Sequence, residues 1–196
     1  MVIWLAKAPS IIKYIWLFGD DEILNTDGVQ RVVDSLFEIP DLVISESNFD
    51  KNMCFDSYKD LLIYAHEIDP VFPVHHTLIT KNIFPVSKFD LDIAYQKIST
   101  NYSHMYGMID ILKHSKKIII FSKNNSAFQV RDNRAAFADP PTNLDKKLVR
   151  LCFEIANSLR YNILKKNIWL YYNMRPIYNL IFSKKVKRML KYINYK

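Results

Sequence analysis

The sequence predicts an α/β fold, because strand-like and helix-like segments alternate along its first half. Residues 13–18 form a short apolar run rich in aromatic and β-branched side chains, which is typical of a buried strand. Asn25 can cap the helix that follows. Pro40 ends this helix, and residues 42–45 have the composition of the next strand. The apolar residues of the helix recur at helical spacing: Val29, Val32, Val33, Leu36 and Phe37.

The next hundred residues continue the mixture of helices and strands. Further helices are expected over residues 57–68, 91–99 and 103–114. Strands or extended segments are expected over residues 117–121 and, more weakly, over 76–79 and 127–130.

A change of character follows the Asp-Pro-Pro-Thr segment at residues 139–142, which is the clearest boundary in the chain. Residues 144–164 are expected to form one helix, and a basic helical segment is expected from residue 176 to the end. We therefore divide the chain into an α/β domain over residues 1–139 and a helical, basic tail over residues 140–196.

Composition excludes several common folds. Hydrophobic residues make up 49% of the 196 residues, which is enough for a folded core. Only 3 glycines are present, and no GxGxxG or GxxxxGK pattern occurs. Dinucleotide-binding and P-loop folds need glycine in their phosphate-binding turns, so we do not expect either of them.

The two cysteines and the N-terminal segment indicate a cytoplasmic protein. Cys54 and Cys152 form no disulfide framework, and we interpret both as reduced core residues. Lys7, Pro9 and Lys13 interrupt the apolar N-terminal segment, so it fits neither a signal peptide nor a membrane-spanning helix.

Positive charge is concentrated at the C-terminus. Residues 160–196 contain ten Lys or Arg and no acidic residue, so the rest of this chain of net charge +7 is about −3. Aromatic residues are interleaved with these cations. A basic amphipathic helix of this kind is typical of segments that lie on an anionic membrane surface. Nucleic-acid binding is the competing use, which we favour less, and a helix packed on the domain with a solvated basic face is the third interpretation.

Residues 13–24 carry a family resemblance. This segment, with Gly19-Asp20-Asp21-Glu22 after the apolar run, resembles the region around the DxD motif of family-2 glycosyltransferases. The closest similarity is to the group that builds O-antigen and capsule sugars, such as abequosyltransferase-like proteins. The order of segments at 41–44, 77–82 and 103–104 also resembles that group, so the resemblance covers about residues 6 to 138. It implies a partial, Rossmann-like GT-A domain that transfers sugars from nucleotide donors.

Two departures qualify what the resemblance implies. Family members have βαβα units that bind the nucleotide ahead of the DxD strand, whereas here this strand begins at Lys13. Ser103-His104 stands where many members carry a Glu-Asp pair. The chain would therefore hold the metal-binding and acceptor-side part of the fold, and a truncated, inactive remnant is the alternative within the same family.

The acidic turn suits a Mg²⁺ or Mn²⁺ ion that stabilises a departing diphosphate. Such hard cations take a few carboxylates and keep positions for phosphate oxygens. Ligands of open α/β sheets bind at the carboxyl ends of the strands, where this turn is expected. We expect Asp21 to be a direct metal ligand and Asp20 to face the donor and complete the metal site. The alternative is a solvated acidic turn with no ligand.

Three other groups are candidate site residues. His104, at a helix start, is the candidate base that takes the acceptor hydroxyl proton, and a hydrogen-bonded structural histidine is the alternative. His75 and His76 are expected at the acceptor site. Their resemblance to a two-histidine phosphoesterase motif lacks the second motif that this fold requires. Arg131 and Arg134 could bind donor phosphates, and surface solvation is the alternative.

Together, these features predict a glycosyltransferase, or a remnant of one, that acts on a lipid-linked or surface-polysaccharide acceptor. We expect it in the cytoplasm or peripherally on the inner face of the cytoplasmic membrane, held there through residues 160–196. The alternative from another class is a non-catalytic basic module that binds membranes or nucleic acid.

Overall fold

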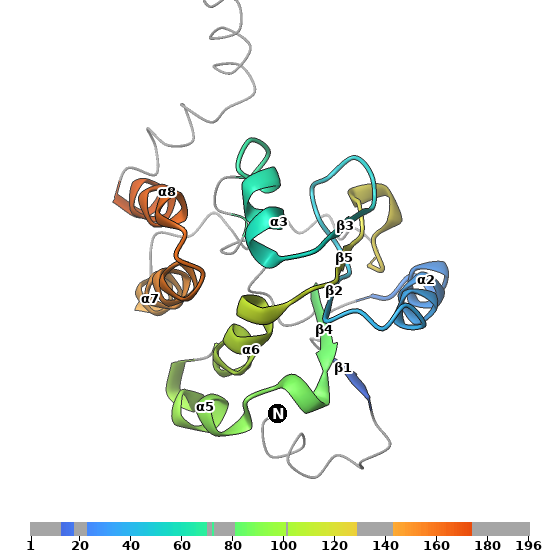
Figure 1. Cartoon of the computed structure of the whole chain (residues 1–196), viewed down its shortest axis with the longest axis horizontal. Helices are drawn as coiled ribbons and strands as arrows, with labels where there is room; N and C mark the ends of the chain where they lie inside the picture. The colour runs from blue at the N-terminus through green and yellow to red at the C-terminus, as the bar shows by residue number, and fades with distance from the viewer. Residues whose placement is uncertain are drawn as a thin grey trace, which may run out of the picture.

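The computed structural model describes residues 13–17, 23–69, 72, 81–100, 102–128 and 143–173, with the side chains of 143–145, 171 and 172 excepted. These residues form a five-stranded mixed sheet and six α-helices (Figure 1). The prediction of an α/β fold is confirmed at this level. Among the described residues, no helix has the length and apolarity needed to cross a membrane.

The strand order in the sheet is β1-β4-β2-β5-β3. Strand β4 runs antiparallel to both β1 and β2, and β2 runs parallel to β5. Strands β1, β2 and β5 therefore point the same way, and their carboxyl ends share one edge of the sheet. Strand β3 is antiparallel to β5 at the far side. The strands are β1 (Tyr14–Trp16), β2 (Leu42–Ile44), β3 (Met53–Phe55), β4 (Asn82–Pro85) and β5 (Ile118–Ile120).

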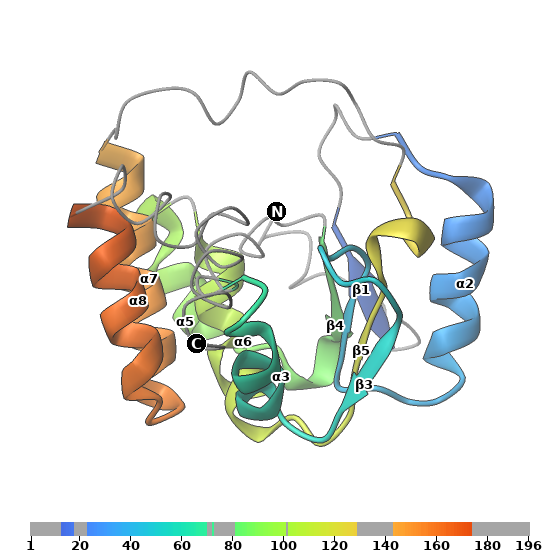
Figure 2. The same ribbon diagram turned by 90° about the horizontal axis from the view of Figure 1, so that it is seen from above.

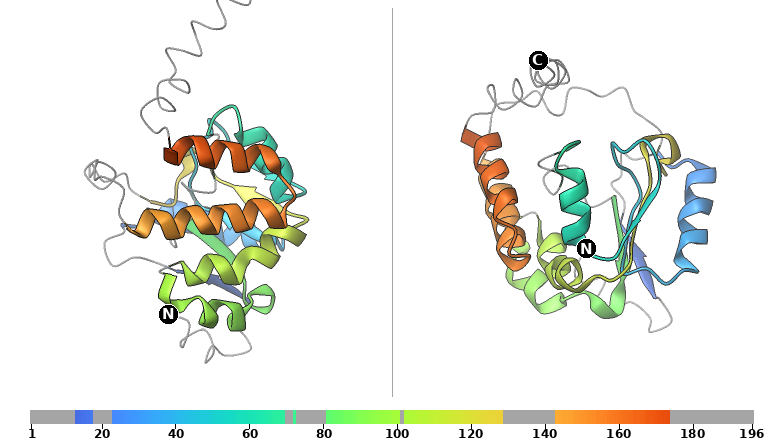
Figure 3. Two further views of the ribbon diagram at one scale, coloured as in Figure 1. Left: turned by 90° about the vertical axis from the view of Figure 1, so that its left-hand side faces the viewer. Right: turned by 45° about the horizontal axis from the view of Figure 1, so that its top comes forward.

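Helices cover both faces of the sheet. Helix α2 alone covers one face, whereas α3, α5 and α6 lie on the other, and α7 and α8 form an outer layer beyond them (Figures 2 and 3). The α-helices are α2 (Thr26–Leu36), α3 (Tyr58–Ala65), α5 (Leu91–Gln96), α6 (Ser103–His114), α7 (Asn143–Ser158) and α8 (Asn162–Asn173). Short 3₁₀ turns are η2 (Val86–Lys88), η3 (Ile98–Thr100) and η4 (Lys123–Asn125).

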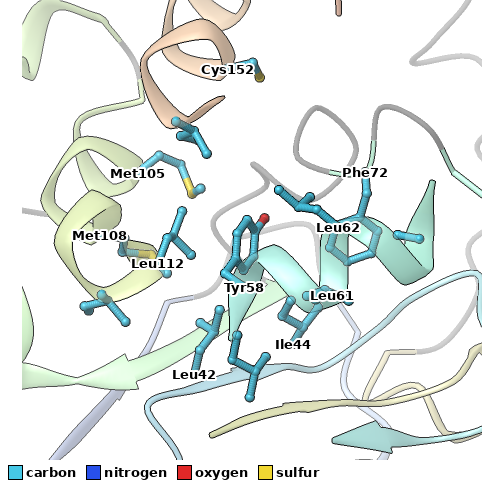
Figure 4. Close-up of a cluster of buried hydrophobic side chains, with 14 of the residues drawn as sticks. Leu42, Ile44, Tyr58, Leu61, Leu62, Phe72, Met105, Met108, Leu112 and Cys152 are labelled. Carbon is cyan, nitrogen blue, oxygen red and sulfur yellow. The ribbon is translucent and has the colours of Figure 1, made fainter. Parts of the chain in front are cut away.

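The alternation of side chains along the strands divides the core in two. Val43 of β2 packs with Val32 of α2 in the smaller cluster. Leu42 and Ile44 point to the opposite face and join the larger cluster, to which α3, α6, α7 and α8 contribute. Figure 4 shows Tyr58 inside this larger cluster, between α3 and α6. Burial raises the pKa of the Tyr58 hydroxyl, so this group stays neutral.

The predicted helix starts and strands of the first half are largely confirmed. The Asn25 side chain accepts a hydrogen bond from the Asp27 N–H at 3.1 Å and begins α2. Ser57 caps α3 in the same way through the N–H of Asp60. Of the weak strand expected at 127–130, the described part shows one bridge, between Leu24 and Phe128. The segment expected to be extended at 76–79 and the basic helix from residue 176 lie outside the described residues.

Two expectations were wrong. The single helix predicted over residues 144–164 is two helices, α7 and α8, which break at Arg160. Arg160 has a φ of 51°, which turns the chain out of the helix. Cys54 is exposed on β3, whereas Cys152 is buried as expected, and burial raises the pKa of its thiol. The interpretation of both cysteines as core residues therefore holds only for Cys152.

Candidate functional site at the carboxyl edge of the sheet

Buried polar side chains gather at the sheet edge where β1, β2 and β5 end. Ser45 follows β2 and is fully buried, and Ser122 follows β5 with 1% exposure. Asn82, the first residue of β4, lies beside Ile44 in the sheet and is also buried. Since ligands of open α/β sheets bind at this edge, the cluster marks the candidate site. In the described part, seven buried polar residues belong to it: Ser45, Ser47, Asn82, Ser103, His104, Ser122 and Ser126.

Hydrogen bonds tie the loops at this edge together. The N–H of Ser45 donates to the Lys81 carbonyl at 2.9 Å, and the N–H of Ala127 donates to the Ser45 carbonyl at 3.1 Å. The Ser47 hydroxyl donates to the Phe121 carbonyl at 2.7 Å. These bonds join the chain segments that follow β2 and β5 to the segment that precedes β4. These hydrogen bonds therefore hold the loops of this edge in a fixed arrangement. We call the edge the polar edge, and its hydrogen-bonded buried polar residues the polar frame.

The Ser122 hydroxyl is the unsatisfied group of this frame. Its oxygen is buried and has no hydrogen-bond partner within the described part of the chain. Buried hydroxyls in folded proteins are nearly always paired. A water molecule or a ligand group at this edge would satisfy it.

His104 lies at the same edge. It is the second residue of α6 and is 5% exposed, so the expectation that it opens a helix is confirmed. The next residue, Met105, accepts a hydrogen bond through its sulfur from the side-chain amide of Asn82 at 3.9 Å. This contact places the first turn of α6 against the start of β4. The proposed role of His104 as a base stays a prediction.

The other predicted site residues lie outside the described part of the chain: Asp20, Asp21, His75, His76, Arg131 and Arg134. One described neighbour of each of their segments in the sequence nevertheless lies at this edge. Leu17 follows β1, Lys81 precedes β4, and Phe128 lies on the same edge, with its ring 6.0 Å from that of Trp16. Leu24, which resumes the chain after the acidic turn, pairs with Phe128. A described residue next to each of the three segments thus lies at the carboxyl edge.

The described residues at this edge include one ion pair. The ammonium group of Lys81 lies 3.4 Å from the Glu46 carboxylate. Within the described ranges, no three His, Cys, Asp or Glu residues are placed to hold a metal ion. The predicted Mg²⁺ or Mn²⁺ site depends on Asp20 and Asp21, so the described residues do not test it.

Two hollows among the described residues lie elsewhere. One, of about 440 Å³, is lined by Asp41, Lys88, Asp110 and His114 beside the C-terminal end of α6. A second lies between α5, α6 and α7 and includes Lys97 and Glu154. Neither contains a predicted site residue, and both mix acidic and basic groups. We therefore place the candidate site at the polar edge.

The polar frame itself was missed by sequence reasoning. Ser45, Asn82 and Ser122 each stand at a strand end, but β4 was not predicted, so nothing in the sequence showed that these residues would meet. A serine within two residues of the end of each of two buried apolar strands, Ser45 after β2 and Ser122 after β5, was the available signal. No protein-family model matches this chain, and no curated protein or solved structure shows significant similarity to it.

Proposed function

We propose that this chain is the metal-binding, acceptor-side part of a glycosyltransferase that transfers a sugar from a nucleotide-sugar donor to a lipid-linked or surface-polysaccharide acceptor. One observation carries the proposal: Leu17, Lys81 and Phe128, which are the described residues next to the acidic turn, the two adjacent histidines and the two arginines in the sequence, all lie at the polar edge. The resemblance of residues 13–24 to the DxD region supplies the chemistry.

The donor would be bound by the acidic turn. Asp21 and Asp20 would bind Mg²⁺ or Mn²⁺, with Asp20 also facing the donor. When bound, the ion stabilises the negative charge that develops on the departing diphosphate. Arg131 and Arg134 would bind the same phosphates, because a guanidinium offers paired donors to phosphate oxygens.

The acceptor would lie near the first turn of α6. An imidazole can take a proton from an acceptor hydroxyl at neutral pH, and the buried His104 precedes Met105, which contacts the buried Asn82. His75 and His76 would contact the acceptor from the segment that precedes β4. In this proposal, a βαβα unit such as the resemblance implies would bind the nucleotide base and ribose.

A second candidate is a non-catalytic basic module that binds a membrane or nucleic acid. The composition of residues 160–196 favours it. This segment contains ten Lys or Arg and no acidic residue, and such a segment attracts anionic membranes and nucleic acids. The two functions are compatible if the basic segment holds a transferase on the inner face of the cytoplasmic membrane.

Calorimetry with a panel of nucleotide sugars, with and without Mn²⁺, tests the proposal. We expect metal-dependent binding that the double variant D20N/D21N abolishes. The matched control D56N/D92N removes two carboxylates far from the edge and should bind as the native chain does. Absence of heat with the native chain excludes donor binding by this chain alone. Retention of vesicle or nucleic-acid affinity without any donor binding supports the second candidate.

A further inference from the structure

Helix α8 presents two different faces. Leu164 and Ile168 are fully buried in the larger core, and the Asn167 side-chain nitrogen lies 3.0 Å from Nδ1 of His66. On the outer side, Trp169 is 52% exposed and Ile163 is 50% exposed. Lys166 lies between them at helical spacing and is exposed. The helix is therefore fixed to the domain by one face and leaves large apolar groups in solvent on the other.

The charged residues of α8 itself are all of one sign. Elsewhere in the described structure, five lysine or arginine side chains have acidic partners: Lys81, Lys88, Lys117, Lys123 and Arg150. By contrast, residues 155–173 contain no acidic residue at all. Lys165, Lys166 and Arg160 have no acidic partner among the described residues. These cations remain available to an external anion.

We propose that the outer face of α8, formed by Ile163, Lys165, Lys166 and Trp169, binds the surface of an anionic lipid bilayer. The indole of a tryptophan suits the boundary between headgroups and acyl chains, and neighbouring lysines attract anionic headgroups. A nucleic-acid surface would use the cations but would leave Ile163 without an apolar partner. The ten cations of residues 160–196 give the charge complementarity that an anionic bilayer requires.

This contact would orient the domain on the membrane. In Figure 2, α7 and α8 run side by side as an antiparallel pair, and α8 ends at the same end of the molecule as η4, which follows β5 at the polar edge. Because α8 lies on the opposite side of the molecule from η4 in Figures 1 and 2, a bilayer against its outer face would lie across the domain from η4 and would fix which side of the protein faces the membrane. Bilayer binding does not rest on the proposed function.

Vesicle binding by the full chain tests the proposal. We expect it to sediment with mixed phosphatidylcholine–phosphatidylglycerol vesicles and not with pure phosphatidylcholine vesicles. Because each lysine near an anionic surface contributes about 1 kcal/mol, K165E/K166E should lower the affinity at least about tenfold. The control K51E/K59E makes the same charge change on exposed residues of another region and should have a much smaller effect. An equal loss of vesicle affinity in the two variants would show that the net charge of the chain causes the effect, and would overturn the assignment to α8.

Tryptophan fluorescence separates α8 from the other cations of the tail. The chain has three tryptophans, so W4F/W16F leaves Trp169 as the single emitter. We expect brominated lipids to quench it in the bound state. A bound protein whose Trp169 is not quenched, or a chain that binds RNA duplexes but no vesicles, overturns the proposal. Donor calorimetry is a separate measurement, so failure of the transferase function would be recognised independently.

Discussion

The side-chain amide of Asn82 donates a hydrogen bond to the sulfur of Met105 at 3.9 Å, and so joins the start of β4 to the first turn of α6. Both residues are buried. Through this contact, the helix that begins with Ser103 and His104 is held at the edge where three parallel strands end. The geometry of a site at this edge therefore depends on the position of α6 as well as on the three strands.

Replacement of His104 by glutamine tests its role directly. If the imidazole takes the acceptor proton, H104Q should lower the rate of sugar transfer about 10²- to 10⁴-fold and leave donor binding unchanged. The control is H114Q on the same helix, because His114 is exposed and pairs with Asp110 at 3.1 Å. Transfer assays and thermal unfolding should be measured on both variants. Equal loss of activity in both, or a loss that follows a lower melting temperature, would show that His104 is a structural residue.

The two described glycines test how closely the helices are packed. A Cβ at Gly28 would lie 2.5 Å from the Cα of Ala127, whereas a Cβ at Gly107 would lie 2.4 Å from the ring of Phe89 and 2.9 Å from the backbone oxygen of Asp90. Replacement of either glycine by alanine increases the intrinsic helix propensity by the same amount, about 1 kcal/mol. The backbone at Ala127 can shift less easily than the side-chain ring of Phe89. G28A should therefore lower the free energy of unfolding by about 1–3 kcal/mol, and G107A should lower it by a smaller amount. Urea unfolding gives both values, and the reverse order would contradict this packing.

The prediction from sequence succeeded where the signals are local. The Asn25 cap, the apolar spacing of α2 and the β-branched run of β5 each describe their own segment. Strand β4 was missed because its sequence, Asn-Ile-Phe-Pro, begins and ends with poor strand formers. Pro85 is tolerated because it pairs with Tyr14 of β1 beyond the end of β2. The polar frame of the candidate site follows from the insertion of β4 between β1 and β2, which no local pattern encodes.

The break at Arg160 is a second non-local feature, and it also yields a prediction. The N–H of Tyr161 bonds to the Ala156 carbonyl and the N–H of Arg160 to the Asn157 carbonyl, which is a Schellman end with arginine at the left-handed position. Glycine adopts this conformation at about 1 kcal/mol less cost. R160G should therefore raise the free energy of unfolding by about 1 kcal/mol in urea titrations. R160A, which removes the same side chain without relieving the strain, should give no gain, and a gain from both would attribute the effect to the lost charge.

Asp41 links stability to pH at the opposite end of the sheet. Burial alone would raise the pKa of its carboxyl, but the Lys88 ammonium and the backbone N–H groups of Lys116 and Lys117, at 2.6 Å and 3.2 Å, outweigh burial and hold the pKa below its ordinary value. A lowered folded pKa stabilises the protein above the unfolded pKa of about 3.9, and this stabilisation is lost as the pH falls through the folded pKa.

Removal of the Asp41 charge should therefore matter at neutral pH and not in acid. D41N should lower the free energy of unfolding by about 1–3 kcal/mol at neutral pH, since it weakens hydrogen bonds to a charged group. The difference from the native chain should shrink at a pH below the folded pKa, where the native carboxyl is also neutral. Urea titrations at both pH values measure this, with the exposed D56N as the control. A difference that stays constant with pH would mean that the amide disturbs packing, and that the Asp41 charge does not hold the start of β2 against the segment leading into β5.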